Sequence, residues 1–162
     1  WKTTEPITFY VHESFPEEMR PALEAAFKVW EKSMNRVVFK IAQYGYSGPL
    51  QPRQDGVNVI YWMDNWEKEK ASEQARTSVF WVGSLIKEAD IRLNAKNFSF
   101  YVEQPNQDKD VHLESLFVHE LGHVLGLKHK DDKPSVMATY LSSETVRNKL
   151  TDDDRQGVSC EY

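Results

Sequence analysis

The chain has 162 residues, of which 40% are hydrophobic and 28% are charged, with seven glycines and seven prolines. This composition excludes collagen-like, low-complexity and disordered proteins, and the length is typical of one domain. Twenty Lys and Arg stand against 25 Asp and Glu, so a net charge of −5 leaves no basic surplus for nucleic acid. No apolar run approaches the roughly 18 residues that span a bilayer. We therefore expect one domain, residues 1–162, with no nucleic-acid partner and no membrane span.

The first predicted elements are a strand and an amphipathic helix. Residues 7–11 alternate apolar and polar side chains, as strands do. Ser14 and Glu17 have the spacing of a capping box, which predicts that a helix starts there. Pro21 would then lie beyond the first turn, so the helix must bend at Pro21 or begin later. The apolar stripe of this helix consists of Met19, Leu23, Ala26, Phe27, Trp30 and Met34.

Further strands and two helices follow along the chain. Segments rich in β-branched and aromatic residues predict strands at 37–41, 57–62, 77–82 and 89–93. Residues 66–75 are too polar to assign. A helix is expected over 111–127, then a turn-rich segment, then a short helix from about Thr151. The predicted order is thus a strand, a helix, several strands and two helices.

A group of closely spaced histidines indicates a metal-binding site. Residues 119–129 read HELGHVLGLKH and contain three of the five histidines. On a helix, His119 and His123 lie about one turn apart on the same face, which suits two imidazole nitrogens that bind one zinc ion. Glu120 lies about 100° further around the helix axis, so its carboxylate can reach a water beside the metal. This spacing predicts a zinc site with Glu120 as a general base.

The third ligand requires a turn of the chain. A straight helix would carry His129 past the metal, and Gly126 can adopt the positive φ that turns the chain back. Three neutral ligands leave the fourth tetrahedral position open, as in catalytic rather than structural zinc sites. His112 lies about 10.5 Å from His119 along the helix axis, and His12 follows a strand. We expect neither of these two to bind the metal.

Several segments resemble one family of metallopeptidases. The run from His119 to His129 is similar to the extended zinc signature of the metzincins, and residues 135–137, Ser-Val-Met, resemble their Met-turn. Residues 89–94 are similar to the strand that precedes the zinc helix in bacterial matrixin-like enzymes. Residues 150–157 resemble the acidic start of the C-terminal helix of matrixins. The chain therefore resembles the matrixin branch, the type of the matrix metalloproteinase catalytic domain, and particularly its bacterial forms.

This resemblance implies an α+β fold with two subdomains. The upper one, about residues 1–129, would hold a twisted five-stranded mixed sheet and two helices above the active-site cleft. The lower one, about 130–162, would hold the Met-turn and a third helix. Met137 would form an apolar floor beneath the zinc, and the antiparallel edge strand 76–82 would pair with an extended substrate. The substrate-binding residues that this placement implies are Thr77, Ser78, Val79 and Tyr140.

The resemblance also implies one catalytic zinc ion. Residues 55–100 contain no histidine, so we expect no second, structural zinc of the kind found in animal matrixins. Calcium is compatible with the many acidic residues, but no loop has a recognisable spacing of oxygen ligands. Lys130 stands where typical matrixins have serine. Ala138 and Thr139 stand where they have Tyr and Pro after the Met-turn, which leaves the shape of the specificity pocket open.

The expected function is that of a zinc-dependent endopeptidase acting on extended protein or peptide substrates. Glu120 would take a proton from the attacking water and return it to the leaving amine. Two alternatives stay open: a non-catalytic, zinc-containing module that binds peptides, and an aminopeptidase on the same scaffold. The resemblance and the start at Trp1 indicate a secreted protein made as a zymogen, and we expect a monomer. Cys160 is expected to be a partly buried packing residue.

Overall fold

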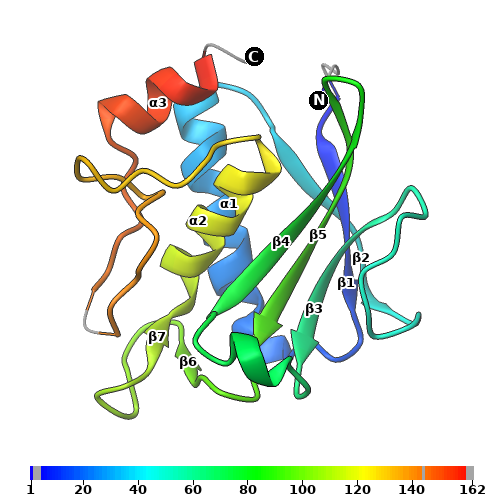
Figure 1. Ribbon diagram of the computed structural model, residues 1–162, viewed down its shortest axis with the longest axis vertical. Helices are drawn as coiled ribbons and strands as arrows, with labels where there is room; N and C mark the ends of the chain where they lie inside the picture. Colours follow the sequence, from blue (N-terminus) through cyan, green and yellow to red (C-terminus); the bar gives the residue numbers. More distant parts are fainter. Residues whose placement is uncertain (2–4, 144, 160–162) are drawn as a thin grey trace.

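The structure of the chain, a computed structural model, describes residues 1, 5–143 and 145–159, so Cys160 lies outside the described residues. A mixed sheet is packed against helices in an α+β arrangement, as expected (Figure 1). The helices are α1 (Arg20–Met34), α2 (Leu113–Val124) and α3 (Asp152–Ser159). The sheet strands are β1 (Ile7–His12), β2 (Phe39–Tyr46), β3 (Asn58–Met63), β4 (Ala75–Val82) and β5 (Leu85–Asn94). Short elements are β6 (Phe100–Tyr101), β7 (Val111–His112) and the 3₁₀ turns Glu17–Met19 and Lys68–Lys70.

The sheet has five strands in the order β2-β1-β3-β5-β4. Strands β2, β1, β3 and β5 run parallel, whereas β4 pairs antiparallel with β5 and lies at the edge. Within β4, Thr77 lies opposite Ile91 and Val79 lies opposite Ala89. The expected five-stranded mixed sheet and its antiparallel edge strand are thus confirmed. The backbone groups on the outer side of β4 are available to an added strand.

The capping box predicted at Ser14 is wrong. The Ser14 hydroxyl lies 2.9 Å from Nδ1 of His12 and accepts the backbone N–H of Trp62 at 3.2 Å. A 3₁₀ turn follows, and α1 begins only at Arg20. This later start places Pro21 in the first turn of the helix, where no backbone N–H is required.

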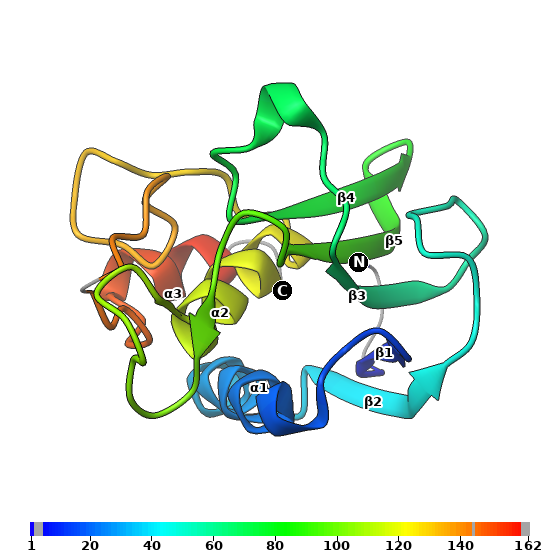
Figure 2. The same cartoon turned by 90° about the horizontal axis from the view of Figure 1, so that it is seen from below.

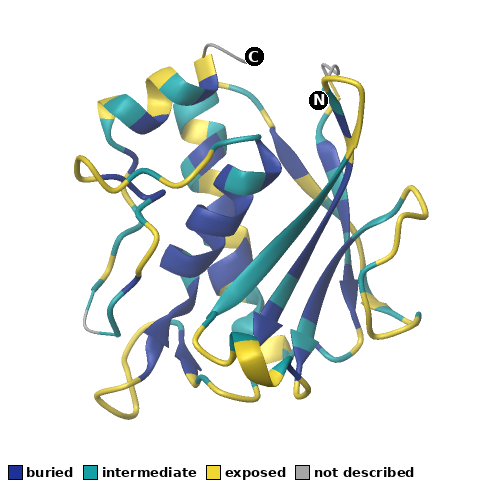
Figure 3. Cartoon of the chain, viewed as in Figure 1, coloured by how far each residue is buried: buried dark blue, intermediate teal, exposed yellow. Residues whose placement is uncertain are grey.

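Helices α1 and α2 cover one face of the sheet and contact each other (Figure 2). The buried side chains of α1 are Ala22, Leu23, Ala26, Phe27 and Trp30, which confirms the predicted stripe for four of its six members. The Trp30 indole donates a hydrogen bond of 3.1 Å to the carbonyl oxygen of Val118 in α2. Helix α2 is buried over nearly its whole length (Figure 3). The core therefore fixes the position of α2, which carries the first two histidines.

Helix α2 is shorter than the predicted range of 111–127. Residues 111–112 form β7, and the helix ends at Val124 because Gly126 adopts a φ of +90°. The N–H of Gly126 bonds to the carbonyl of His123, and the N–H of Leu127 bonds to that of Gly122, both at 2.9 Å. These two bonds make a Schellman motif, which turns the chain out of the helix axis. The turn predicted at Gly126 is present.

No helix in the described part of the chain is both long and apolar enough to cross a membrane.

Strand β2 begins at Phe39 and extends to Tyr46, five residues beyond the predicted end. Its additional residues continue the parallel pairing with β1, with irregular register at two places. Pairing with a neighbour, which the local pattern does not reveal, extends this strand.

Asp154 connects α3 with the segment that precedes Met137. Its buried carboxylate accepts hydrogen bonds from the Ser135 hydroxyl and, at 3.2 Å, from the backbone N–H of Val136. It also accepts the N–H and the hydroxyl of Thr151, each at 2.8 Å. This carboxylate therefore holds both the start of α3 and the Met-turn.

We expect Asp154→Ala to lower the free energy of unfolding by about 3 kcal/mol, because a hydrogen bond to a charged group contributes about 1.5–3 kcal/mol and buried donors lose their acceptor. The matched control is Asp152→Ala, whose side chain is 91% exposed. The control is expected to stay within about 0.5 kcal/mol of the parent. Urea unfolding of the three proteins measures both effects. Equal losses in the two variants would contradict this role of Asp154.

Two buried carboxylates on β5 hold the loop that precedes β3. Glu88 and Asp90 project from the same face of the strand. Glu88 accepts the backbone N–H of Gly56. Asp90 accepts the N–H of Arg53 at 3.1 Å and that of Val59 at 2.8 Å. The acidic residues of β5 thus serve here as acceptors for backbone N–H groups.

Burial is the main cause that raises the pKa of Asp90 from 3.8 to about 7, and the nearby charges of Glu88 and Asp55 add to it. The folded state therefore binds this proton more tightly than the unfolded chain does. The resulting stability is complete below pH 3.8 and is lost as the pH rises through about 7. We expect the free energy of unfolding to fall less steeply between pH 5 and 8 in Asp90→Asn than in the parent. Urea unfolding at four pH values tests this, and an unchanged slope would refute it.

Candidate metal centre and active-site cleft

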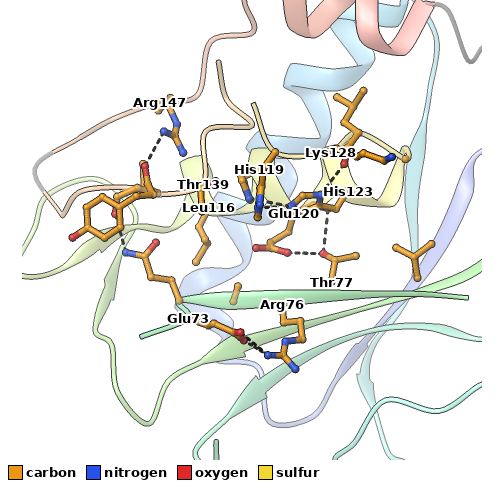
Figure 4. A pocket seen from close by; sticks show the side chains of 18 of the residues that line it. Glu73, Arg76, Thr77, Leu116, His119, Glu120, His123, Lys128, Thr139 and Arg147 are labelled. Carbon is orange, nitrogen blue, oxygen red and sulfur yellow. Dashed lines mark hydrogen bonds and ion pairs between the residues drawn. The ribbon is translucent and has the colours of Figure 1, made fainter. Parts of the chain in front are cut away.

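Three histidine side chains converge at the C-terminal end of α2. Nε2 of His123 lies 3.1 Å from Nε2 of His119 (Figure 4). The same atom also lies 3.1 Å from Nε2 of His129. Among the described residues, these three form the group whose ligand atoms lie close enough to hold a metal ion. The turn at Gly126 brings the third histidine to the first two, as its spacing predicted.

Hydrogen bonds on the far side of the rings fix their protonation. Nδ1 of His119 lies 2.8 Å from the carbonyl oxygen of Val136, and Nδ1 of His123 lies 2.8 Å from that of Leu127. A carbonyl only accepts, so each Nδ1 carries the proton and each Nε2 presents a lone pair. Burial also lowers the pKa of His119 to about 3 and lowers that of His123, which keeps both rings neutral.

This arrangement of donors fits zinc. Lone pairs that face each other at 3.1 Å without an intervening proton repel, so a cation between them relieves the repulsion. Zinc–nitrogen bonds of about 2.0–2.1 Å in a tetrahedron separate two ligand nitrogens by roughly 3.3 Å. Carbonyl acceptors on the opposite ring nitrogens are also typical of zinc-binding histidines. The three imidazoles therefore have the atom type, spacing and orientation that a zinc ion requires.

Glu120 lies beside the histidines and points across the cleft. Its side chain is buried, and burial raises the pKa of its carboxyl to about 7. The hydroxyl of Thr77 in β4 donates a hydrogen bond of 2.6 Å to Oε2 of Glu120 (Figure 4). Glu120 does not belong to the group of three metal-holding histidines. Its carboxylate is placed to act on a molecule next to the metal.

Met137 packs against the turn of α2 that carries the ligands. A Cβ atom at Gly122 would lie 2.3 Å from Sδ of Met137, so the space that a side chain at position 122 would need holds the thioether. The chain after His129 is tied to Met137, because the N–H of Lys130 donates a hydrogen bond of 2.9 Å to the carbonyl oxygen of Met137. This role of Gly122 was not predicted, although the glycine lies inside the histidine motif.

A cavity of about 710 Å³ adjoins the histidines. Thr77 and Val79 of β4 line one wall, and Tyr140 lines the part formed by the segment after the Met-turn. Ser78 lies between the first two on the strand and is not among the lining residues. Trp81, near the predicted edge strand, also lines the cavity, and further lining residues that were not predicted include Gln74, Arg76, Leu116, Leu141 and Arg147.

Arg147 holds the wall that contains Tyr140. Its guanidinium donates hydrogen bonds of 3.0 Å to the carbonyl of Tyr140 and 2.8 Å to that of Ala138. Its own backbone N–H donates to the hydroxyl of Ser115 in α2 at 2.7 Å. No local sequence pattern signals this role, because the contacts join segments up to 32 residues apart.

The other two histidines lie away from the metal-holding group. Nδ1 of His112 contacts the Ser115 hydroxyl at 2.7 Å, and Nε2 of His12 lies 3.0 Å from the carbonyl oxygen of Gly48. Both side chains are buried. That neither of them binds the metal stays a prediction.

The chain is similar to proteins that are named as metalloproteinases. Matrix metalloproteinase-16 of Homo sapiens is 47% identical over 60 residues, which is 36% of this chain and 10% of that protein. Metalloendoproteinase 2-MMP of Arabidopsis thaliana is 40% identical over 52 residues, covering 32% of this chain and 14% of the relative. The aligned segments thus span only a small part of these relatives. The matrixin family profile matches residues 1–162, so this chain belongs to the matrixin family.

Proposed function

We propose that the protein is a zinc-dependent endopeptidase that cleaves extended protein or peptide substrates. The observation that carries this proposal is the convergence of His119, His123 and His129 beside the carboxylate of Glu120 in an open cavity. Membership of the matrixin family supports it. The three histidines would hold the zinc ion, and Glu120 would act as the general base.

In the proposed hydrolysis, the histidines, Glu120 and two backbone carbonyls would have separate roles. Zinc held by the three imidazoles would act as a Lewis acid on the scissile carbonyl and on the attacking water. The Glu120 carboxylate accepts a proton from that water and later donates it to the leaving amine. The carbonyls of Val136 and Leu127 keep the rings of His119 and His123 oriented throughout.

Strand β4 is the proposed platform for the substrate. It is the edge of the sheet and lines the cavity, so an extended peptide can add to it through main-chain hydrogen bonds. The main chain at Thr77, Ser78 and Val79 would supply these bonds. Tyr140, which is 75% exposed, would contact a substrate side chain from the opposite wall.

Several broader expectations belong to the same proposal. Residues 1–162 would form one catalytic unit, with the upper subdomain ending near His129 and the lower one containing Met137 and α3. The family resemblance supports secretion, synthesis as a zymogen and action as a monomer. One catalytic zinc is proposed, without a second structural zinc.

A library of quenched fluorescent peptides, blocked at both ends, tests the activity with the zinc-loaded protein. We expect cleavage at internal bonds, which would exclude an aminopeptidase because blocked peptides have no free amino terminus. Cleavage of unblocked peptides alone would favour that aminopeptidase. Peptide binding without cleavage of either set would favour the non-catalytic binding module and refute the endopeptidase.

A further inference from the structure

The strongest unassigned feature is the contact between the edge strand and the general base. The Thr77 hydroxyl lies 2.6 Å from Oε2 of Glu120 and 3.3 Å from the backbone carbonyl oxygen of the same residue. The shorter contact is a charge-assisted hydrogen bond when the carboxylate is ionised. It joins two residues that are 43 positions apart in the sequence and that both line the cavity.

This hydrogen bond restricts the carboxylate. A glutamate side chain has three rotatable bonds, and in the described part of the chain Thr77 is the residue whose side chain is hydrogen-bonded to the carboxylate of Glu120. Thr77 itself is held firmly, because its β-branched side chain has few rotamers and its backbone is paired with β5 opposite Ile91. The hydroxyl of Thr77 thereby fixes the Oε2 end of the carboxylate.

We propose that Thr77 is a positioning residue that holds the Glu120 carboxylate for proton transfer. This proposal rests on the proposed endopeptidase function and replaces direct substrate binding as the role of the Thr77 side chain. The same strand would bind the substrate through its main chain. Substrate binding and positioning of the base would therefore use the same strand.

Two substitutions separate the hydroxyl from the shape of the side chain. Thr77→Val keeps the β-branched shape and removes the hydroxyl, and Thr77→Ser keeps the hydroxyl. We expect Thr77→Val to lower kcat by about 10- to 100-fold, the range of one hydrogen bond to a charged group, with KM nearly unchanged. Thr77→Ser should restore kcat to within a few-fold of the parent. Zinc content of both variants should match that of the parent, and the thermal midpoint of Thr77→Val should fall by only a few °C because the buried carboxylate loses one donor.

A double-mutant cycle with Glu120→Gln shows whether Thr77 acts through the carboxylate. At high enzyme concentration, Thr77→Val should cause no further loss in the Glu120→Gln background, since no proton acceptor is left to position. An equal loss in both backgrounds, or a raised KM with unchanged kcat, would overturn the proposal. A parent protein that cleaves no peptide would instead refute the endopeptidase function, so the two failures are distinguishable.

Discussion

Glu120→Gln is expected to lower kcat by about 10²- to 10⁴-fold, the contribution of a well-placed general base. Glutamine preserves the size of the side chain and an acceptor for the Thr77 hydroxyl, but its amide cannot take a proton from water. KM should change little, because the proposed substrate contacts lie on β4 and near Tyr140. Steady-state kinetics on the best library peptide measure both constants.

A matched control lies on the same helix. Glu114 accepts a hydrogen bond of 2.9 Å from the Asn148 amide and is not a lining residue of the cavity. Glu114→Gln keeps that acceptor and should retain kcat within a few-fold. Zinc analysis must find one ion per chain in the parent and in both variants. A Glu120→Gln protein that holds zinc and turns over at the parent rate would remove Glu120 from the mechanism.

Local spacing predicted the candidate metal centre because its three histidines and Glu120 all lie within 11 consecutive residues. His119 and His123 require only a helix, and His129 requires only the turn at Gly126, whose φ is +90°. The edge strand and the five-stranded sheet were predicted with the help of the family resemblance. The α1 stripe was predicted from periodicity alone, since residues three or four positions apart lie on the same face of a helix.

The remaining features depend on contacts between distant segments. Ser14 has the sequence context of a helix cap, yet it bonds instead to His12 and Trp62, and the second of these belongs to a strand 48 residues later. Thr77 was expected to touch substrate, and the hydrogen bond from its hydroxyl to Glu120 was not predicted. No sequence pattern indicated that Arg147 would bond to the carbonyls of Tyr140 and Ala138. Such positions become functional only when the fold brings their partners within hydrogen-bond distance.

Withdrawal of zinc is expected to abolish cleavage and to lower the thermal midpoint by on the order of 10 °C. A ligand at 1,000 times its Kd stabilises the folded state by about 4.1 kcal/mol. In a chain of this size, each kcal/mol of stabilisation raises the thermal midpoint by about 2–4 °C. The physical cause is the set of Nε2 lone pairs that face each other at 3.1 Å when no cation lies between them. Because the hydrophobic core includes the buried faces of α1, α2 and the sheet, the metal-free protein should remain folded.

Differential scanning calorimetry with chelator, and then with added zinc, measures this shift and its reversal. His129→Ala removes one ligand from the exposed side of the centre and should abolish the response to zinc. His112→Asn changes a histidine of the same region that lies outside the metal-holding group, and it should respond to zinc as the parent does. If His129→Ala still gained the full thermal shift from zinc, the ion would bind elsewhere, and the three histidines would not form the metal centre.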